Sequence, residues 1–328
     1  MEFSADPDQI DGQFPKTVVV TVTYRCNLSC LMCESGRAEL PQADPEQLLQ
    51  FFSRLAAWLP RPRVVLLTGG EPLLHPRLID FVKRLAEHEF TAALNTNGAL
   101  LTPDRASELI EAGLSKINIS LDGIGEVHDQ LRNAPGLYQG VMDILDYLTR
   151  HTPLAVTVVS LITGINASGL PEMVRRLMTL PRAPRIAFQA LVPTLGRPWR
   201  SEFYRQSPLW PRRHAEVGRV LAAIEELERL LAAGAPIINP PSQFAMWRDY
   251  FLNPLHFLDD EICRVESSLN VLADGTLTFC DHLGPVGTIA DDPRAVWNSL
   301  AASDFRRRMQ QCSKACNYLV NCCYKSTC

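Results

Sequence analysis

The sequence has no feature that would place the protein in a membrane, on nucleic acid or outside the cell. No apolar run approaches the roughly 18 residues that a membrane-spanning helix needs. The N-terminus is acidic and has no apolar signal-peptide core. The formal net charge of −4 provides no overall basic field for nucleic acid or anionic lipid. We therefore expect a cytoplasmic protein that binds neither nucleic acid nor membrane.

Cysteine is absent from the long middle part of the chain. Three of the ten cysteines lie at positions 26–33, none lies between 34 and 262, and seven lie at 263–328. Disulfides are typical of secreted proteins, and the chain has no export signal. Two terminal groups of thiols with a cysteine-free middle therefore indicate metal ligation in a reducing cytosol.

The composition is that of an ordinary globular protein, with 46% hydrophobic and 21% charged residues among 328. This length predicts one large domain, or one domain with an appendage. The expected boundaries are a tail at 1–14, a first domain at 15–196, a linker and helical segment at 197–255, and a cysteine-rich region at 256–328.

Strand-like runs alternate with amphipathic helical stretches along the first domain. The expected strands are Thr17–Thr23, Val64–Thr68, Thr91–Thr96, Lys116–Leu121, Ala155–Leu161 and Ile186–Val192. The expected helices lie near Pro45–Trp58, Arg77–His88, Pro103–Ala112, Tyr138–Thr149 and Leu170–Leu180, with two more near Arg213–Ala233 and Ser242–Phe251. This rhythm predicts right-handed βαβ units and a parallel sheet. Six units are too few for a closed eight-stranded barrel, so we expect an α/β partial (βα)6 barrel, with its site at the carboxyl ends of the strands.

The first three cysteines follow the first expected strand at the spacing C-x3-C-x2-C: Cys26, Cys30 and Cys33. Three thiolates can hold three irons of a [4Fe–4S] cube and leave the fourth iron free to bind a small molecule. A structural zinc site needs a fourth ligand close by, and none of residues 34–70 is a Cys or His. The spacing therefore indicates a cluster with an open iron.

The second expected strand ends in Thr68-Gly69-Gly70-Glu71-Pro72, where paired glycines let the backbone approach a ligand closely. Together with the three cysteines, this segment resembles the radical S-adenosylmethionine (radical SAM) superfamily. The resemblance implies that S-adenosylmethionine binds the open iron and is cleaved by one electron. It also implies that the 5′-deoxyadenosyl radical so formed takes a hydrogen atom from the substrate, and that a flavodoxin or ferredoxin supplies the electron.

The same resemblance implies a set of cofactor-binding residues. Met32 is expected against the adenine, Ser120 and Asp122 toward the ribose and methionine, and Arg132 on the methionine carboxylate. Asn95 and Asn97 are expected to reach the ribose or the substrate. The full set of implied cofactor contacts is Met32, Gly69, Gly70, Glu71, Asn95, Ser120, Asp122, Arg132 and Leu191, the last through its backbone.

The C-terminal cysteines carry a second resemblance. Cys263, Gly275 and Cys280 fit the C-x(9–15)-G-x4-C pattern of the SPASM and twitch extensions, and Ala273–Cys280 is expected to be a hairpin with an Asp-Gly turn. The remaining cysteines depart from the family spacing; they are Cys312, Cys316, Cys322, Cys323 and Cys328. These seven predict either one auxiliary [4Fe–4S] cluster with spare thiols, or two clusters with one open iron. A zinc ribbon is the alternative.

The spare thiols bear on the reaction. A free thiol among Cys312, Cys316, Cys322, Cys323 and Cys328 would return a hydrogen atom to a substrate radical and make the enzyme an epimerase. Without such a donor, the auxiliary cluster would accept the radical's electron and make it a dehydrogenase.

The substrate is not readable from any residue. About 15 residues precede the first strand, so we expect no N-terminal leader-binding domain of the kind common in peptide-modifying relatives. This favours a small carbohydrate-like substrate, such as an aminoglycoside or sugar, over a ribosomal peptide or protein. Asp281 and His282 are the preferred candidates for substrate contact. The Trp199, Arg200, Tyr204 and Trp210 stretch is either a wall of the substrate pocket or a packed linker.

Overall fold

The computed structural model describes residues 14–33, 41–193, 200–255, 268–280, 282–312, 314–316 and 320–321. Its strands are β1 Thr17–Thr23, β2 Val64–Gly69, β3 Thr91–Thr96, β4 Lys116–Ser120, β5 Ala155–Ile162, β6 Arg185–Ala190, β7 Ser268–Val271, β8 Thr276–Thr278 and β9 Gly287–Thr288. Its α-helices are α1 Pro45–Trp58, α2 Leu78–Glu87, α3 Pro103–Glu111, α4 Glu126–Arg132, α5 Leu137–His151, α6 Leu170–Leu177, α7 Phe203–Gln206, α8 His214–Ala232, α9 Pro241–Leu252, α10 Pro293–Trp297 and α11 Leu300–Gln310. Short 3₁₀ turns lie at Pro72–Leu74 and Ala167–Gly169.

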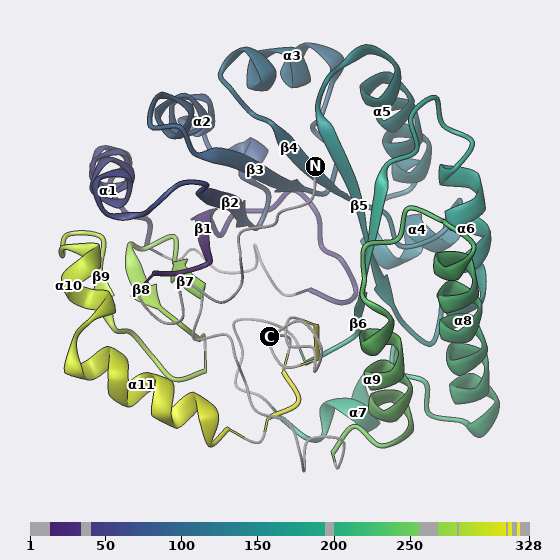
Figure 1. Ribbon diagram of the computed structural model, residues 1–328. Coiled ribbons are helices and arrows are strands. Elements are labelled where there is room, and N and C mark those ends of the chain that lie inside the picture. Colours follow the sequence, from purple (N-terminus) through teal and green to yellow (C-terminus); the bar gives the residue numbers. More distant parts are fainter. Residues whose placement is uncertain are drawn as a thin grey trace.

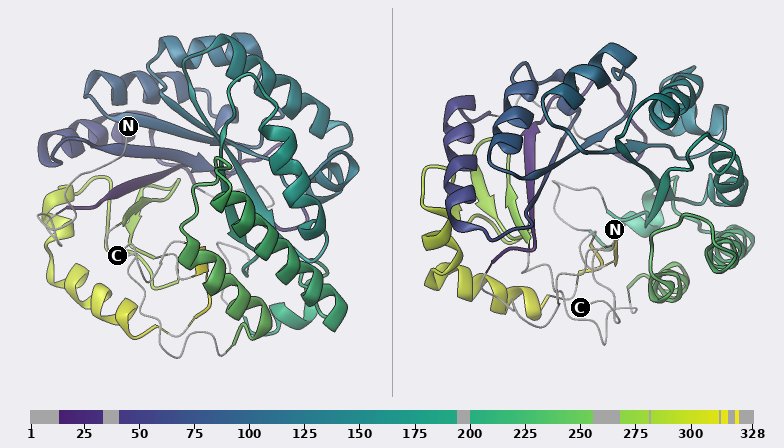
Figure 2. Two further views of the ribbon diagram at one scale, coloured as in Figure 1. Left: turned by 45° about the vertical axis from the view of Figure 1, so that its right-hand side comes forward. Right: turned by 45° about the horizontal axis from the view of Figure 1, so that its top comes forward.

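The described strands form one curved sheet in the order β6-β5-β4-β3-β2-β1-β7-β8-β9. Strands β1 to β6 are parallel neighbours, as predicted, and each of the six expected strands exists with bounds that differ by at most two residues. Helices α1, α2, α3, α5 and α6 cover the outer face of the curve (Figure 1). The two further views show the same open α/β partial barrel from other sides (Figure 2).

The alternation of side chains along each strand separates two faces of the sheet. In β1, Val18, Val20 and Val22 are buried, while Val19 and Thr21 between them are only half-buried. Successive residues of a strand point to opposite faces, so the fully buried set lies under the helices and the other set lines the barrel interior. The polar residues on this interior face are the ones available to a ligand.

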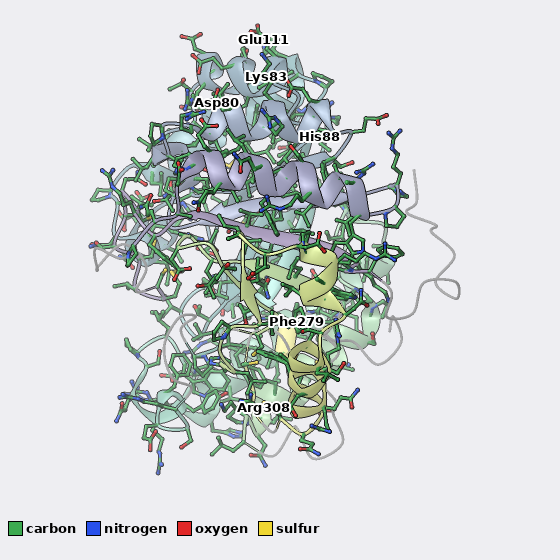
Figure 3. All side chains as sticks on the ribbon, turned by 90° about the vertical axis from the view of Figure 1, so that its left-hand side faces the viewer. Asp80, Lys83, His88, Glu111, Phe279 and Arg308 are labelled. Atoms are coloured by element: carbon green, nitrogen blue, oxygen red, sulfur yellow. The ribbon has the colours of Figure 1, made fainter. Side chains whose placement is uncertain are left out.

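The helices of the outer layer begin and end where their sequences indicate. The side chain of Asp44 accepts a hydrogen bond from the Glu46 N–H at the start of α1, and that of Thr102 accepts one from Arg105 at the start of α3. The outward faces of α2 and α3 are charged, and Figure 3 shows Asp80, Lys83 and Glu111 at the outer surface. No helix in the described ranges has the length and apolar character to cross a membrane.

The cysteine-rich region does not form a separate layer. Strand β7 pairs in parallel with β1, from Thr17 beside Ser268 to Val20 beside Val271, so the hairpin of β7 and β8 continues the barrel sheet. The predicted hairpin turn is confirmed, because the Gly275 N–H donates to the Leu272 carbonyl and Gly275 adopts a positive φ of 86°. Its first strand lies earlier than expected, at Ser268–Val271.

Four α-helices of the described chain have no counterpart among the expected elements: α4, α7, α10 and α11, of which α7 spans only 4 residues. Helix α4 spans 7 residues and α10 spans 5, which is too short for a helical period to stand out. Helix α11 buries only Ala302, Phe305 and Met309, and its other positions are largely polar or arginine. Phe279 of the hairpin region packs edge-on against Trp297 and Phe305, which ties α10 and α11 to the sheet (Figure 3).

Candidate active site

The first three cysteines lie in the loop that leaves the carboxyl end of β1. Cys30 is buried, and Cys26 and Cys33 are half-buried. The Cys33 N–H donates to the Cys30 carbonyl at 3.2 Å and forms a turn between the second and third cysteines. The loop therefore stands at the strand ends, where parallel βα proteins place their sites.

The two glycines after β2 bring this strand end against the cysteine loop. The Gly70 N–H donates to the Thr23 carbonyl at 2.9 Å, and the Glu71 N–H donates to the Arg25 carbonyl at 2.8 Å. A Cβ on Gly70 would lie 2.2 Å from the Arg25 carbonyl oxygen. The close approach that the paired glycines predict is thus made to the protein's own loop, immediately before Cys26.

The carboxylate of Glu71 points inward and is fully buried. It accepts hydrogen bonds from the Leu73 N–H, the Thr96 hydroxyl and the Asn97 N–H, at 2.8–3.1 Å. Burial raises the pKa of Glu71, and these hydrogen bonds act in the opposite direction. Glu71 therefore joins the end of β2 to the end of β3, rather than presenting its side chain to a ligand.

Asn97 extends this hydrogen-bond network to the cysteine loop. Its side-chain nitrogen donates to the Asn27 side-chain oxygen at 2.9 Å and lies 3.9 Å from the Cys26 sulfur. Glu71 holds the backbone of Asn97, so the two residues together place an N–H donor beside one thiol. Asn97 was expected at the ribose or substrate, and here it contacts the cysteine loop.

Asp122, after β4, is completely buried, and each of its polar groups has a partner. Its N–H donates to His128 Nδ1 at 3.0 Å, and its carbonyl accepts from Asn166 at 2.7 Å. Its Oδ1 accepts from the Leu161 N–H at 2.8 Å, while Arg132 Nε and Nη2 approach Oδ2 at 2.7 and 2.6 Å. Asp122 and Arg132 thus have each other as partners within the protein. Their expected contacts with the cofactor stay predictions.

Arg132 also lies against the second cysteine. Burial raises the pKa of the Cys30 thiol, and the neighbouring Arg132 guanidinium opposes that shift. Two donors, Arg132 and Asn97, thus stand beside two of the three sulfurs. Such donors suit thiolates that carry the negative charge of a bound iron–sulfur cluster.

A row of neutral polar side chains crosses the interior face of the sheet. Asn118 of β4 donates to the Asn95 side-chain oxygen at 2.7 Å, and Asn95 of β3 donates to the Thr68 hydroxyl at 3.3 Å. The strand register places Thr21 beside Thr68 and Thr157 beside Asn118, so that five parallel strands contribute to the row. Asn95 was predicted at this site; the other members were not, because an alternation of Asn and Thr along separate strands gives no local motif.

The remaining predicted cofactor contacts have less specific surroundings. Ser120 is half-buried on the same face as Asn118, two residues closer to the carboxyl end of β4. Met32 is half-buried and packs against the hydrophobic core. The Leu191 carbonyl accepts the Tyr250 hydroxyl at 2.9 Å, so this backbone group, expected at the adenine, has a protein partner.

The described C-terminal cysteines lie on segments that return to the barrel. Cys280 and Cys316 are buried and Cys312 is half-buried. Cys263, Cys322, Cys323 and Cys328 lie outside the described residues, as do Asp281 and Trp199. The His282 N–H lies 3.4 Å from the Cys280 sulfur, at hydrogen-bonding distance. His282 therefore neighbours a predicted ligand.

Two asparagine amides join the edge of β6 to the segments beyond it. The Asn321 side chain accepts from the Ala190 N–H at 2.8 Å and donates to the Ala190 carbonyl at 3.0 Å. The Asn239 side chain does the same for Phe188, at 2.7 and 3.0 Å. Each amide thus acts like a neighbouring strand, and Asn321 holds the last described cysteine segment against the barrel.

Tyr204 and Trp210, two members of the expected pocket wall, are buried in an aromatic cluster. Trp210 stacks on Phe251 with ring centroids 5.0 Å apart and meets Tyr204 edge-on at 4.8 Å. The Tyr204 hydroxyl donates to the Ala315 carbonyl at 3.3 Å. These two residues therefore belong to a packed linker. Arg200 is exposed and lies outside this cluster.

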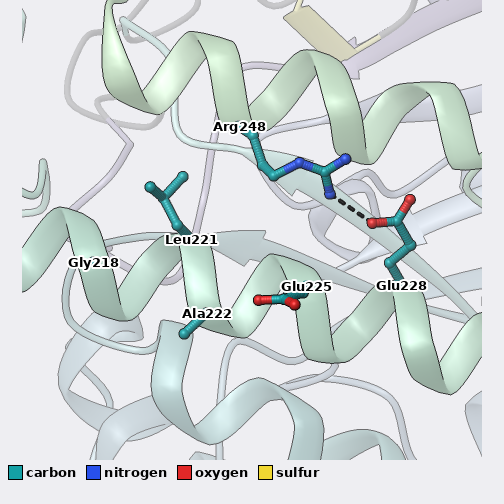
Figure 4. A pocket seen from close by; sticks show the side chains of 6 residues that line it. All are labelled: Gly218, Leu221, Ala222, Glu225, Glu228 and Arg248. Carbon is teal, nitrogen blue, oxygen red and sulfur yellow. Dashed lines mark hydrogen bonds and ion pairs between the residues drawn. The ribbon is translucent and has the colours of Figure 1, made fainter.

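Two surface hollows lie away from the first cysteine loop. A groove of about 540 Å³ runs between α8 and α9 and is crossed by the Arg248–Glu228 ion pair (Figure 4). A second hollow of about 340 Å³ is lined by Leu283, Arg308, Gln311, Cys312 and Lys314. The first has no cysteine in its lining, and the second adjoins one predicted auxiliary ligand.

The three N-terminal cysteines fit a cluster better than a single metal ion. Within the described ranges, no three His, Cys, Asp or Glu side chains are set to hold one ion. A cube does not require this, because each thiolate binds a different iron. Thiols with N–H donors beside Cys26 and Cys30 are the donor set that an iron–sulfur cluster needs.

An open βα barrel with three cysteines at its carboxyl end defines the class of cluster-binding barrel proteins. Residues 20–177 match the model of the radical SAM superfamily, so the chain carries a radical SAM domain, and the resemblance read from the sequence is confirmed. The family implies a [4Fe–4S] cluster and S-adenosylmethionine as cofactors. The match does not extend to the C-terminal region, so the SPASM or twitch assignment stays a prediction.

Two curated relatives are GTP 3′,8-cyclases. The chain is 29% identical to that of Pelotomaculum thermopropionicum over 278 residues, covering 81% of each chain. It is 33% identical to a probable GTP 3′,8-cyclase of Methanopyrus kandleri over 177 residues, which is 52% of this chain and 55% of the relative. The chain thus spans about half the length of the second relative.

Solved structures share the fold at low sequence identity. Streptococcus suis SuiB bound to S-adenosylmethionine gives a TM-score of 0.68 at 14% identity, covering 90% of this chain and 68% of SuiB. BtrN in complex with AdoMet and 2-DOIA gives a TM-score of 0.52 at 18% identity, covering 97% of this chain and 96% of BtrN. At such identities the likeness establishes the fold alone.

Proposed function

We propose that this radical SAM enzyme takes a hydrogen atom from a small carbohydrate-like molecule, such as a sugar or aminoglycoside, and thereby dehydrogenates or epimerises it. The observation that carries the proposal is the neutral row of Thr68, Asn95 and Asn118 on the interior face of the sheet. Hydroxyl and amide groups match the donors and acceptors of a polyol without requiring it to carry charge. The likeness in length and fold to BtrN, solved with 2-DOIA, supports the same choice.

The chain's own residues would bind, orient and shield the reactants. Cys26, Cys30 and Cys33 would hold the cluster, and the Gly70 and Glu71 backbone fixes the loop that carries them. When bound, the cluster and S-adenosylmethionine supply a one-electron cleavage that generates the 5′-deoxyadenosyl radical. The neutral row would present one C–H bond of the substrate toward the strand ends, where the three cysteines lie.

The proposal includes one or two auxiliary [4Fe–4S] clusters at the C-terminal cysteines and a flavodoxin or ferredoxin as electron donor. Burial of Cys280 and Cys316 supports a ligand role, since a cluster is held by cysteine thiolates. An auxiliary cluster held by these cysteines would supply an electron acceptor, and a substrate radical that lost one electron and one proton would give a ketone. With a thiol donor, the radical regains a hydrogen atom with inverted configuration.

A nucleotide is the second candidate substrate. The alignment with the Pelotomaculum GTP 3′,8-cyclase, which covers 81% of both chains, favours it.

The test is anaerobic incubation of reconstituted, reduced enzyme with S-adenosylmethionine and one candidate substrate at a time: an aminocyclitol, GTP or a short peptide. We expect 5′-deoxyadenosine formation to rise only with the aminocyclitol. In deuterated solvent, deuterium at carbon indicates epimerisation and a ketone indicates dehydrogenation. The Cys26→Ala variant is the control and should form no 5′-deoxyadenosine. Consumption of GTP, or of the peptide, in place of the aminocyclitol would overturn the proposal.

A further inference from the structure

The C-terminal end of helix α4 contacts the cysteine loop directly. The Leu31 N–H donates to the Leu131 carbonyl at 2.9 Å, and the Asn133 side chain donates to the Ser29 hydroxyl at 2.9 Å. Arg132 lies between these two contacts, so its cation stands beside Cys30, which lies between Ser29 and Leu31. Three consecutive residues at the end of α4 therefore contact three consecutive residues around the second cysteine.

The guanidinium of Arg132 is held in place by Asp122, whose own position is fixed by several hydrogen bonds. Asp122 is completely buried and is bonded through its N–H, its carbonyl and both carboxylate oxygens. Arg132 uses Nε and Nη2 on Asp122 Oδ2, and a guanidinium has five N–H donors in a rigid fork. The fork therefore has donors left for the sulfur of Cys30.

We infer that Asp122 and Arg132 are positioning residues that hold a positive charge against one cluster thiolate and raise the reduction potential of the barrel cluster. The inference rests on the radical SAM assignment and deepens it by naming how this chain adjusts its own cluster. The potentials of [4Fe–4S] clusters depend on net charge and on hydrogen bonds to the sulfurs. A fixed cation beside Cys30 stabilises the reduced cluster, which carries one more negative charge. Cluster reduction therefore becomes easier for the electron donor.

The test is an EPR-monitored redox titration of the reconstituted holoenzyme without S-adenosylmethionine. The barrel-cluster signal is the one that is missing from Cys26→Ala. Asp122→Asn leaves Arg132 charged but without its ionic anchor, whereas Asp122→Asn with Arg132→Gln removes the buried charge pair together and avoids the unpaired Asp122 charge that Arg132→Gln alone would leave. We expect about a tenfold lower ratio of reduced to oxidised cluster at a fixed potential in the double variant, equivalent to about 59 mV for one electron. In Asp122→Asn the loss of an anion favours the reduced cluster and opposes the loss of the anchor, so the double variant carries the test.

Arg150→Gln is the matched control, because Arg150 and Asp146 form an exposed ion pair on α5 far along the chain from the cysteines. Its midpoint potential should equal that of the unchanged enzyme. An unchanged potential in the double variant with full iron content would overturn the inference. So would folded variants that hold no barrel cluster, because the pair would then serve assembly and not the potential. Neither the redox titration nor the iron analysis needs a substrate. If the substrate assay fails, the result of this test can therefore still be interpreted.

Discussion

At the scale of single residues, the site depends on backbone atoms that approach each other more closely than a Cβ allows. Gly70 is the clearest case: its N–H bonds to Thr23, and its Cα hydrogens face the carbonyls of Tyr24 and Arg25. The position of Cys26 therefore depends on the absence of a side chain more than 40 residues away along the chain. From the sequence, Gly70 was expected to contact the cofactor. In the structure it packs against the loop that carries the three cysteines.

The first prediction is that Gly70→Ala displaces the cysteine loop. The added Cβ would lie 2.2 Å from one backbone oxygen and 2.7 Å from another, which no side-chain motion relieves. We expect a loss of about 1–3 kcal/mol of unfolding free energy and loss of iron at the barrel site, measured by denaturation and iron analysis. The control is Gly140→Ala in α5, where nothing lies within 4 Å. It should gain about 0.4–1 kcal/mol and keep its iron; equal iron content in the two variants would contradict the account.

The second prediction concerns His128, which is fully buried and accepts the Asp122 N–H. Burial lowers its pKa from 6.5 to about 4; Asp122 and Asp129 oppose this shift, and Arg132 adds to it. The unfolded chain therefore binds a proton that the folded chain does not, between these two pH values. Stability contributed by neutral His128 is complete above about pH 6.5 and is lost as pH falls toward 4. At about 1.36 kcal/mol per pKa unit, the loss is about 3 kcal/mol.

Urea unfolding between pH 7.5 and 4.5 measures this dependence. His128→Asn keeps an acceptor near the position of Nδ1 but cannot be protonated in this range. We expect the unchanged protein to lose stability more steeply than the variant as pH falls. Using the difference between the two proteins removes contributions that they share, including acid loss of iron. Identical slopes would show that His128 does not titrate on unfolding.

At the scale of elements, the edge of β6 is covered by one backbone bridge, between Ile186 and Ile237, and by two asparagine side chains. Asn239 and Asn321 each return one donor and one acceptor to the β6 backbone. An exposed strand edge is a site of unwanted pairing, and this arrangement removes the hazard. It also holds residues near Cys316 at the carboxyl end of the barrel, so one element edge positions a candidate ligand segment.

The third prediction is that Asn321→Ala releases this segment. The Ala190 N–H and carbonyl would lose their partners in a buried setting, at a cost of about 1–3 kcal/mol for each unsatisfied group. Hydrogen exchange at Ala190 should become faster, and Cys316 of the iron-free protein should be alkylated sooner. The exposed Asn298→Ala, whose side chain bonds only to the Arg294 carbonyl among the described contacts, is the control and should change neither. Unchanged exchange at Ala190 would remove the assigned role of Asn321.

Elements with a strong local pattern were predicted from sequence almost to the residue. Strands β1 and β3 and helix α1 have the expected bounds, because alternating valines and capped amphipathic runs are local signals. Helices α4 and α11 were not expected. Helix α4 is short and is stabilised by its contacts with the cysteine loop, and α11 by Arg306, which lies over the Trp297 ring at 4.3 Å. Such contacts come from residues distant in sequence.

At the scale of the whole molecule, the cysteine-rich region completes the barrel sheet. Strand β7 covers the edge of β1, the strand that leads into the first cysteine loop. The barrel sheet therefore includes strands from both sides of the boundary expected at residue 256. Loss of the C-terminal region would expose the edge of β1 and remove Asn321 from the end of β6.

The fourth prediction is that residues 1–255 alone do not fold cooperatively. The bare edge of β1 and the apolar surface beneath α10 and α11 would favour aggregation. Soluble yield and thermal unfolding measure this directly. The matched control is the full chain with its seven C-terminal cysteines changed to serine, which keeps β7 but has no thiol ligands there. A cooperative unfolding transition for residues 1–255 would show that the barrel is independent of β7.

The fifth prediction is the iron content of the reconstituted protein. One auxiliary cluster gives about eight irons per chain and two give about twelve, with an equal number of sulfides. Cys26→Ala should remove about four of them and leave the rest. Zinc at the C-terminal cysteines would overturn the SPASM or twitch prediction without touching the barrel cluster.

The sequence by itself determined the strand–helix alternation, the three-cysteine loop and the superfamily, because each is recognised from residues that are close together in the sequence. Only the tertiary structure decided that Glu71 and Asp122 turn inward to hold Asn97 and Arg132 beside the sulfurs. It also decided that Thr68, Asn95 and Asn118 meet in one row. The physical reason is that register and crossover geometry place residues from separate strands side by side, and no local spacing encodes that placement.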